Sequence, residues 1–212
     1  MATYNYLMKF ILIGNSGVGK SSMLFQFIED KFHKGLEPTI GIEFGTKLIK
    51  IANTSIRLQI WDSAGQENYR SITRSYYRNT ICAFLMYDIT NRNSFNDVKS
   101  WLEEAKTYGN ASMHFVLLAN KCELEDQRVV MTHEGLKFAQ DNHLAFFEIS
   151  AIENINVIKA FEDSVEKVLS DIKKGVIDPY NESLGVKVGN AGNKQDFIIN
   201  RIAEKRRRKK CC

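Results

Sequence analysis

The sequence predicts one α/β domain built on a six-stranded mixed sheet, with five parallel strands, one antiparallel edge strand and helices on both faces. Short strand-like apolar runs alternate with stretches of helical periodicity as far as about residue 174. The run at residues 81–87 is apolar throughout, which is typical of a strand buried on both faces. Residues 42–51 and 55–62 are joined by a short turn at residues 53–54, which predicts a hairpin and hence the antiparallel edge.

The expected elements follow one another along the chain. The first strand ends at Ile13, and apolar residues at helical spacing from Met23 to Ile28 predict the first helix. Residues 30–41 and 63–78 lose this periodicity and are expected to be loops. The later elements are a helix through Val98 and Trp101 with Asn93 or Ser94 as its N-cap, a strand at residues 114–119, a helix at 132–142, a strand at 145–149 and a closing helix that ends near residue 174.

Composition and charge separate a domain from a tail. The chain is 44% hydrophobic and 25% charged, which is ordinary for a soluble domain. The net charge of +4 falls to −2 when residues 201–212, with seven Lys and Arg against one Glu, are set aside. Basic composition therefore gives no support for nucleic-acid binding by the domain. From residue 175 the sequence is rich in Gly, Asn and Ser, so we expect a domain at residues 1–174 and a flexible tail at 175–212.

The cysteines and histidines predict neither a disulfide framework nor a metal cluster. Two of the four cysteines are Cys82 and Cys122, and the other two end the chain as Cys211 and Cys212. No signal peptide is recognised, so a reducing cytosolic setting is expected. The longest apolar run, residues 81–87, is too short to span a membrane. The four histidines have no metal-ligand spacing.

Residues 14–21 carry the strongest chemical signal in the chain. They fit G-x-x-x-x-G-K-[ST] and lie between an apolar strand and an amphipathic helix. Three glycines let the backbone turn its N–H groups toward bound phosphates, where Lys20 would reach the β- and γ-phosphates and Ser21 would offer a hydroxyl to Mg²⁺. A Gly-rich turn that matches by accident is the alternative, but the motif has the strand and helix that it requires.

A second motif follows the strand at residues 55–62. Asp62 stands at its carboxyl end, where an open α/β sheet places metal-binding groups. Gly65 can bring a backbone N–H close to a γ-phosphate, and the amide of Gln66 can orient a water molecule because it both donates and accepts hydrogen bonds. By itself this motif is also compatible with an ordinary Asp-Gly turn.

Together these motifs resemble the Ras superfamily of small GTPases. The residues that carry the resemblance are the phosphate loop, Thr39 and residues 62–66, 120–121 and 150–151. More narrowly, residues 40–44, 57–61, 70–78 and 85–90 resemble the Rab family, over about residues 4–190. Residues 6–7, 70–75 and 175–176 are similar to its ER-to-Golgi branch, Rab-two.

The resemblance implies a P-loop NTPase G domain at residues 1–174 that binds GTP or GDP with Mg²⁺. Residues 30–41 and 63–78 would be switches I and II, which the γ-phosphate orders, although plain surface loops remain the alternative. Catalysis would rest on Gln66, Lys20 and Thr39, and Mg²⁺ binding on Ser21, Thr39 and Asp62. The implied nucleotide-binding residues outside the base site are Asn15, Ser16, Gly17, Val18, Gly19, Lys20, Ser21, Ser22, Thr39 and Gly65.

The base-binding residues depart from the family pattern. Glu123 stands where the family has an Asp that accepts hydrogen bonds from guanine, and the extra methylene is expected to weaken guanine selectivity. Ile152 replaces a Lys, and Ser63 replaces a Thr. The other implied base contacts are Phe32 and Lys121 on the two ring faces, Asn120, Ser150 and the backbone N–H of Ala151.

An aromatic group lies outside the pattern of its strand. Ile56, Leu58 and Ile60 form the core face, so Trp61 falls on the other face, with Phe44 as a diagonal neighbour if the turn is at residues 53–54. With Tyr76 these residues match the Rab aromatic triad that contacts effectors: Phe44, Trp61 and Tyr76. A satellite apolar cluster beneath the switch loops is the alternative, and both can hold.

The tail resembles the Rab site for double geranylgeranylation. Cys211 and Cys212 follow a basic run at residues 205–210, and two lipid chains give stable anchoring. A nuclear-localisation-like run or simple solvated charge is the alternative. Apolar residues at helical spacing in residues 195–210 predict a short helix on anionic membranes, against the alternative of a disordered spacer.

The family function is a monomeric GTP/GDP switch of vesicle traffic between ER and Golgi, on the cytoplasmic face of membranes and cycling through the cytosol. The implied partners are effectors, an exchange factor, a GTPase-activating protein, a GDP-dissociation inhibitor and a prenylation escort protein, with no nucleic acid. A P-loop kinase would need an Arg-rich lid, for which no insertion is long enough. A nucleotide-binding module with a degraded base site and little GTPase activity is supported only by Glu123 and Ile152.

Overall fold

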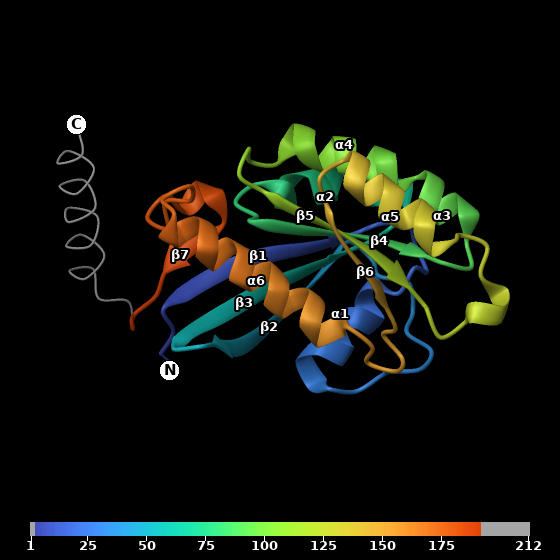
Figure 1. Cartoon of the computed structure of the whole chain (residues 1–212), viewed down its shortest axis with the longest axis horizontal. Coiled ribbons are helices and arrows are strands. Elements are labelled where there is room, and N and C mark those ends of the chain that lie inside the picture. Colours follow the sequence, from blue (N-terminus) through green and yellow to red (C-terminus); the bar gives the residue numbers. More distant parts are fainter. Residues whose placement is uncertain (1–2, 192–212) are drawn as a thin grey trace.

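A computed structural model of the chain describes residues 3–191 (Figure 1). Its strands are β1 (Tyr6–Ile13), β2 (Ile42–Ile51), β3 (Thr54–Ser63), β4 (Cys82–Asp88), β5 (His114–Asn120), β6 (Ala145–Ile149) and β7 (Val186–Val188). Its α-helices are α1 (Lys20–Glu29), α2 (Arg70–Tyr77), α3 (Arg92–Asn96), α4 (Val98–Tyr108), α5 (Thr132–Asp141) and α6 (Val157–Lys173). The predicted lipidation at Cys211 and Cys212 and the predicted tail helix lie outside the described residues.

The sheet has the order β2-β3-β1-β4-β5-β6. Strands β3, β1, β4, β5 and β6 are parallel to one another, and β2 pairs antiparallel with β3 at the edge. All seven residues of β4 are buried, as the apolar run predicts. The predicted α/β class, with its mixed sheet and antiparallel edge, is confirmed.

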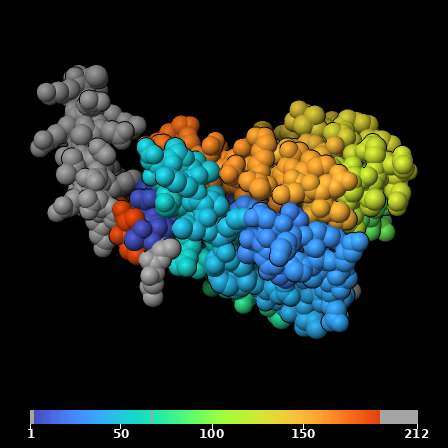
Figure 2. Space-filling view, turned by 90° about the horizontal axis from the view of Figure 1, so that it is seen from below, coloured from blue at the N-terminus to red at the C-terminus, as the bar shows by residue number. Residues whose placement is uncertain are grey.

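Two apolar layers enclose the sheet. Helices α1 and α6 pack on one face, where Phe10, Phe27 and Phe161 belong to one core cluster. Helices α2, α4 and α5 pack on the other, around Trp101 and Tyr87. Figure 2 shows α6 in orange and the chain around α1 in blue covering the first face. No helix within residues 3–191 is both long and apolar enough to cross a membrane.

The prediction of a flexible linker beyond residue 175 is wrong for residues 176–191, which pack on the domain. Ile177 and Val186 are each 1% exposed and belong to the core, and β7 adds an unpredicted strand antiparallel to β1. The backbone N–H of Lys9 donates to the carbonyl of Gly185 at 2.9 Å. Apolar residues here are too few and too irregularly spaced to show a period, and their partner strand is remote in sequence.

Three smaller expectations also differ. The hairpin turn consists of Ala52 and Asn53, because Ile51 pairs with Thr54. This shift by one residue places Phe44 directly opposite Trp61 rather than diagonal to it. Residues 63–78 contain helix α2 as well as loop. The helix expected after residue 93 is divided into α3 and α4, and α3 is capped by Asn91, whose side chain accepts a hydrogen bond from the N–H of Ser94 at 3.1 Å.

Candidate functional site

The loop between β1 and α1 has the conformation that its glycines were expected to allow. Gly14, Gly17 and Gly19 have φ values of 141°, 77° and 97°. A Cβ on Gly14 would lie 2.2 Å from the carbonyl oxygen of Met86, and one on Gly19 would lie 2.3 Å from Nδ2 of Asn120. Positive φ and close backbone packing both exclude larger residues here. The loop can therefore present its N–H groups to an anion.

Lys20 lies at the centre of this loop. Its ammonium donates to the carbonyl oxygens of Gly14 at 2.9 Å and Asn15 at 2.8 Å. Burial lowers the pKa of Lys20 to about 8, against the opposing effect of Asp62. Helix α1 begins at Lys20 and has no side-chain cap, so its first N–H groups and its positive dipole end face the loop. A cation and a helix N-terminus here both favour bound phosphate.

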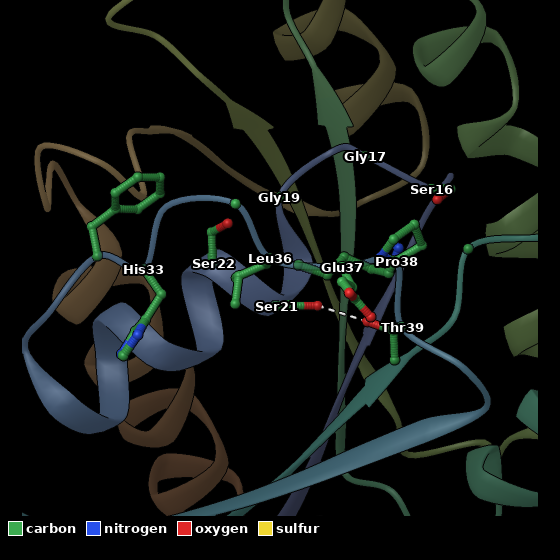
Figure 3. A pocket seen from close by; sticks show the side chains of 14 residues that line it. Ser16, Gly17, Gly19, Ser21, Ser22, His33, Leu36, Glu37, Pro38 and Thr39 are labelled. Atoms are coloured by element: carbon green, nitrogen blue, oxygen red, sulfur yellow. Dashed lines mark hydrogen bonds between the residues drawn. The ribbon is translucent and has the colours of Figure 1, made fainter.

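Three oxygen-bearing side chains, those of Ser21, Thr39 and Asp62, meet beside the loop. Figure 3 shows the contact between Ser21 and Thr39. The hydroxyls of Ser21 and Thr39 are 2.8 Å apart, and both donate to Oδ2 of Asp62. The other carboxylate oxygen, Oδ1, is buried and has no hydrogen-bond partner within residues 3–191, and burial raises the pKa of Asp62 to about 6. This set of oxygen ligands fits Mg²⁺, which would compensate the buried charge of Asp62. The structure thus brings together all three predicted metal residues.

The cavity above these residues has a volume of about 280 Å³ (Figure 3). Its walls are the phosphate loop, the segment at residues 32–39 and Gly65. A Cβ on Gly65 would lie 2.2 Å from the backbone of both Asn15 and Ser16, so the segment after β3 packs on the loop with no room for a side chain. His33, Leu36 and Glu37 also line the cavity, although the sequence offers no chemical signal for them.

Three predicted residues contribute differently from expectation. The side chain of Asn15 points away from the cavity and binds Asp97 and Trp101. Val18 is buried in the core, so only its backbone is available to a ligand. Gln66 follows Gly65 but does not line the described cavities. Its role in orienting water stays a prediction.

A second cavity of about 330 Å³ adjoins the first through Gly17, Gly19, Ser22 and Phe32. The predicted base-binding residues Asn120, Lys121, Glu123, Ala151 and Ile152 line it, together with Leu124, which was not predicted. The structure therefore brings the base-binding motif next to the phosphate site, although the two are about a hundred residues apart in sequence.

Asn120 and its neighbours form the inner wall of this second cavity. Asn120 donates to the carbonyl of Val18 at 2.7 Å and accepts from the backbone N–H of Ala151 at 3.2 Å. The N–H predicted to reach a base is thus engaged within the protein here. Ser150 is fully buried, and its Oγ accepts from the N–H of Glu153 at 3.0 Å, so it shapes the turn rather than lining the cavity. Lys121 pairs with Asp88 at 2.5 Å.

Glu123 is a lining residue of this cavity with an unmatched carboxylate. Both of its carboxylate oxygens are buried and have no hydrogen-bond partner among the described residues. A buried carboxylate without donors is costly, and a ligand with adjacent N–H groups would satisfy it. The edge of guanine that bears N1–H and the exocyclic amine has this donor pattern. The residues present therefore fit a guanine nucleotide.

Comparison with known families agrees with this geometry. A model of the Ras family matches residues 9–170. The chain belongs to the Ras family. It is therefore a small GTPase, a switch that hydrolyses GTP. Ras family members generally bind GTP or GDP with Mg²⁺ and work with regulators and effectors, and the two adjoining cavities contain residues that suit such a ligand.

Proposed function

We propose that this Ras family protein is a Rab-type switch that recruits effectors to intracellular membranes, in traffic between ER and Golgi. The aromatic group Phe44, Trp61 and Tyr76 carries this proposal. Ring centroids of Phe44 and Trp61 are 4.7 Å apart, and those of Trp61 and Tyr76 are 4.8 Å apart. Phe44 is 49% exposed. The group joins β2 and β3, the strands between the two switches, to helix α2 of switch II. A partner bound there would therefore contact switch II directly and lie three residues beyond the end of switch I.

The switching residues are linked through the phosphate site. Thr39 of switch I reaches Ser21 and Asp62, and Gly65 of switch II lies on the phosphate loop. When bound, Mg²⁺ neutralises phosphate charge and adds ligand bonds to this end of switch I. Loss of the γ-phosphate would remove the group that the switch segments enclose, which favours their release. A change of nucleotide would thereby alter the aromatic surface.

The proposal includes slow GTP hydrolysis in the absence of an activating protein. Lys20 is the one lysine that lines the described phosphate cavity, and no arginine lines it. An arginine supplied by an activating protein would stabilise charge on the transferred phosphoryl group, as in other GTPases of this class. Gln66 would orient the attacking water once switch II closes.

Membrane attachment would come from Cys211 and Cys212 after the basic run at residues 205–210. Two prenyl chains supply stable anchoring, and each basic residue near an anionic leaflet adds about 1 kcal/mol. The proposed partners are an exchange factor, an activating protein, a GDP-dissociation inhibitor and a prenylation escort protein.

Enzymatic prenylation of the full chain tests the Rab assignment. The purified GDP-bound protein is incubated with geranylgeranyl donor and Rab geranylgeranyl transferase, with and without the escort protein, and its intact mass is measured. Two added chains that require the escort protein are expected. Cys211→Ser should accept one chain and the double variant with Cys212→Ser none. Modification that ignores the escort protein, or none at all, would contradict the assignment.

A binding module with little GTPase activity is the competing function, favoured by Glu123 and Ile152 at the base cavity. Identification of the nucleotide released from the denatured protein, followed by single-turnover hydrolysis of GTP, separates the two. Bound GDP with slow turnover is expected for the switch. A protein that contains no guanine nucleotide and does not hydrolyse GTP would favour the module.

A further inference from the structure

The phosphate loop is fastened to helix α4 by the side chain of Asn15. Its Oδ1 accepts a hydrogen bond from Nε1–H of Trp101 at 2.8 Å, and its Nδ2 donates to Oδ2 of Asp97 at 2.7 Å. Trp101 is 1% exposed, so its indole N–H depends on this acceptor. Both ends of the Asn15 amide are therefore held from outside the nucleotide cavity.

The backbone of Asn15, unlike its side chain, lies against Lys20 and Gly65 of the phosphate site. Its carbonyl oxygen accepts from the ammonium of Lys20 at 2.8 Å. A Cβ added to Gly65 would lie 2.2 Å from the carbonyl carbon of Asn15, which shows how closely switch II approaches here. Rotation of the Asn15 peptide would thus alter both the support of Lys20 and the surface on which Gly65 lies.

The same indole contacts switch II. The guanidinium of Arg70 stacks over the Trp101 ring, 4.3 Å from its centroid, and Arg70 Nη1 donates to Oγ of Ser100 at 3.2 Å. Arg70 is the first residue of α2. Helices α2 and α4 are neighbours on one face of the sheet (Figure 1). One buried side chain therefore lies between the first residue of helix α2 and the phosphate loop.

We propose that Trp101 is a positioning residue that couples the docking of helix α2 to the affinity of the phosphate loop for its nucleotide. With Arg70 stacked, the indole is fixed and its N–H holds Asn15. When α2 moves away, the ring loses its covering cation, and the Asn15 peptide gains freedom. Coupling of this kind is reciprocal, so the bound nucleotide also biases the position of α2. The proposal rests on nucleotide binding and is independent of the membrane role.

GDP release from the full chain tests the coupling, because two residues that act through one indole have non-multiplicative effects. Release of fluorescent GDP is measured for Asn15→Ala, Arg70→Ala and the double variant. Each single change should accelerate release about three- to tenfold, the effect of one net hydrogen bond or cation–π contact. The double variant should be no faster than the faster single variant. Trp101→Phe, which keeps the ring and loses the N–H, should resemble Asn15→Ala.

Arg74 provides the matched control. It lies on the same helix, stacks over Tyr108 at 5.0 Å and pairs with Glu104 at 3.5 Å. Arg74→Ala removes a contact between α2 and α4 away from Trp101 but keeps Arg70 stacked on the indole. Its effect on GDP release should therefore multiply with that of Asn15→Ala. The proposal would be overturned if the effects of Arg70→Ala and Asn15→Ala on GDP release also multiplied. A wild-type rate of GDP release from Trp101→Phe would overturn it as well.

Fluorescence gives a readout that purely structural packing would not change. The chain has two tryptophans, so Trp61→Phe leaves Trp101 as the only one. Its emission should change when GDP is replaced by a non-hydrolysable GTP analogue, and Arg70→Ala should abolish this change while Arg74→Ala keeps it. Identical emission in both nucleotide states would contradict the coupling. Prenylation with the escort protein is unaffected by either result, so the two proposals fail separately.

Discussion

Asn120 donates a hydrogen bond from Nδ2 to the carbonyl oxygen of Val18 at 2.7 Å, and both groups are buried. This contact joins the base-binding loop to the phosphate loop across the carboxyl edge of the sheet. A nucleotide that bridges the two cavities is thus held by loops with a fixed spacing. A small change in the position of a carboxylate or cation around the ligand should therefore change nucleotide affinity.

Glu123→Asp should bind GDP more tightly than the wild type, by about tenfold or more. The shorter side chain removes the extra methylene, so the carboxylate can meet the base without folding back, and a full charged hydrogen bond contributes about 1.5–3 kcal/mol. Discrimination against xanthine and inosine nucleotides should also rise. Titration with fluorescent nucleotides measures both quantities, with the exposed Glu125→Asp as control. Equal GDP affinity in the variant and the wild type would mean that the loop conformation already compensates for the extra methylene of Glu123.

Gln66→Leu should slow GTP hydrolysis by orders of magnitude and leave GDP affinity nearly unchanged. Leucine has a similar size but cannot orient water, and positioning contributes several kcal/mol to such reactions. Gln66 does not line the phosphate cavity, so its loss should spare binding. Single-turnover hydrolysis beside nucleotide titration decides the matter. Matching hydrolysis rates in the variant and the wild type would remove Gln66 from the mechanism.

Val186→Ala should lower the free energy of unfolding by about 1–2 kcal/mol, because it removes buried methyl groups from the core. Val188→Ala, two residues further on the same strand and only half-buried, should cost less. Thermal or denaturant unfolding of the GDP-bound chain compares the two. An unchanged midpoint for Val186→Ala would show that residues 176–191 are the linker that composition predicts.

Lys9→Met should change the pH dependence of stability. The Lys9 ammonium lies 5.0 Å from the Trp61 ring centroid, and burial lowers the pKa of Lys9 to about 8. The folded protein therefore binds fewer protons than the unfolded chain between about pH 8 and the ordinary lysine pKa. Wild type should gain stability relative to the variant as pH rises through this window, with a constant difference below pH 8. Unfolding series at several pH values measure it, and parallel curves would refute the shifted pKa.

Much of the site could be predicted because its signals are contiguous. The phosphate loop needs glycines at fixed offsets between a strand and a helix, and β4 needs an apolar run, so each can be recognised within a few residues. The resemblance to small GTPases implies one metal site of Ser21, Thr39 and Asp62, and these side chains meet in the structure. Phe44 and Trp61 were placed on one face by the period of the strands, although the turn shifted their register.

The sequence by itself determined the six main strands and most of the helices, the antiparallel edge of the sheet and the residue types around the phosphates, because these follow from local backbone preference and periodic burial. Only the tertiary structure decided that the side chain of Asn15 binds Trp101, that both oxygens of Glu123 are buried with no donor among residues 3–191, and that Val186 pairs with β1. Each of these depends on segments that are remote in sequence. The polar groups and strand edges of such segments find their partners only when the whole core has packed.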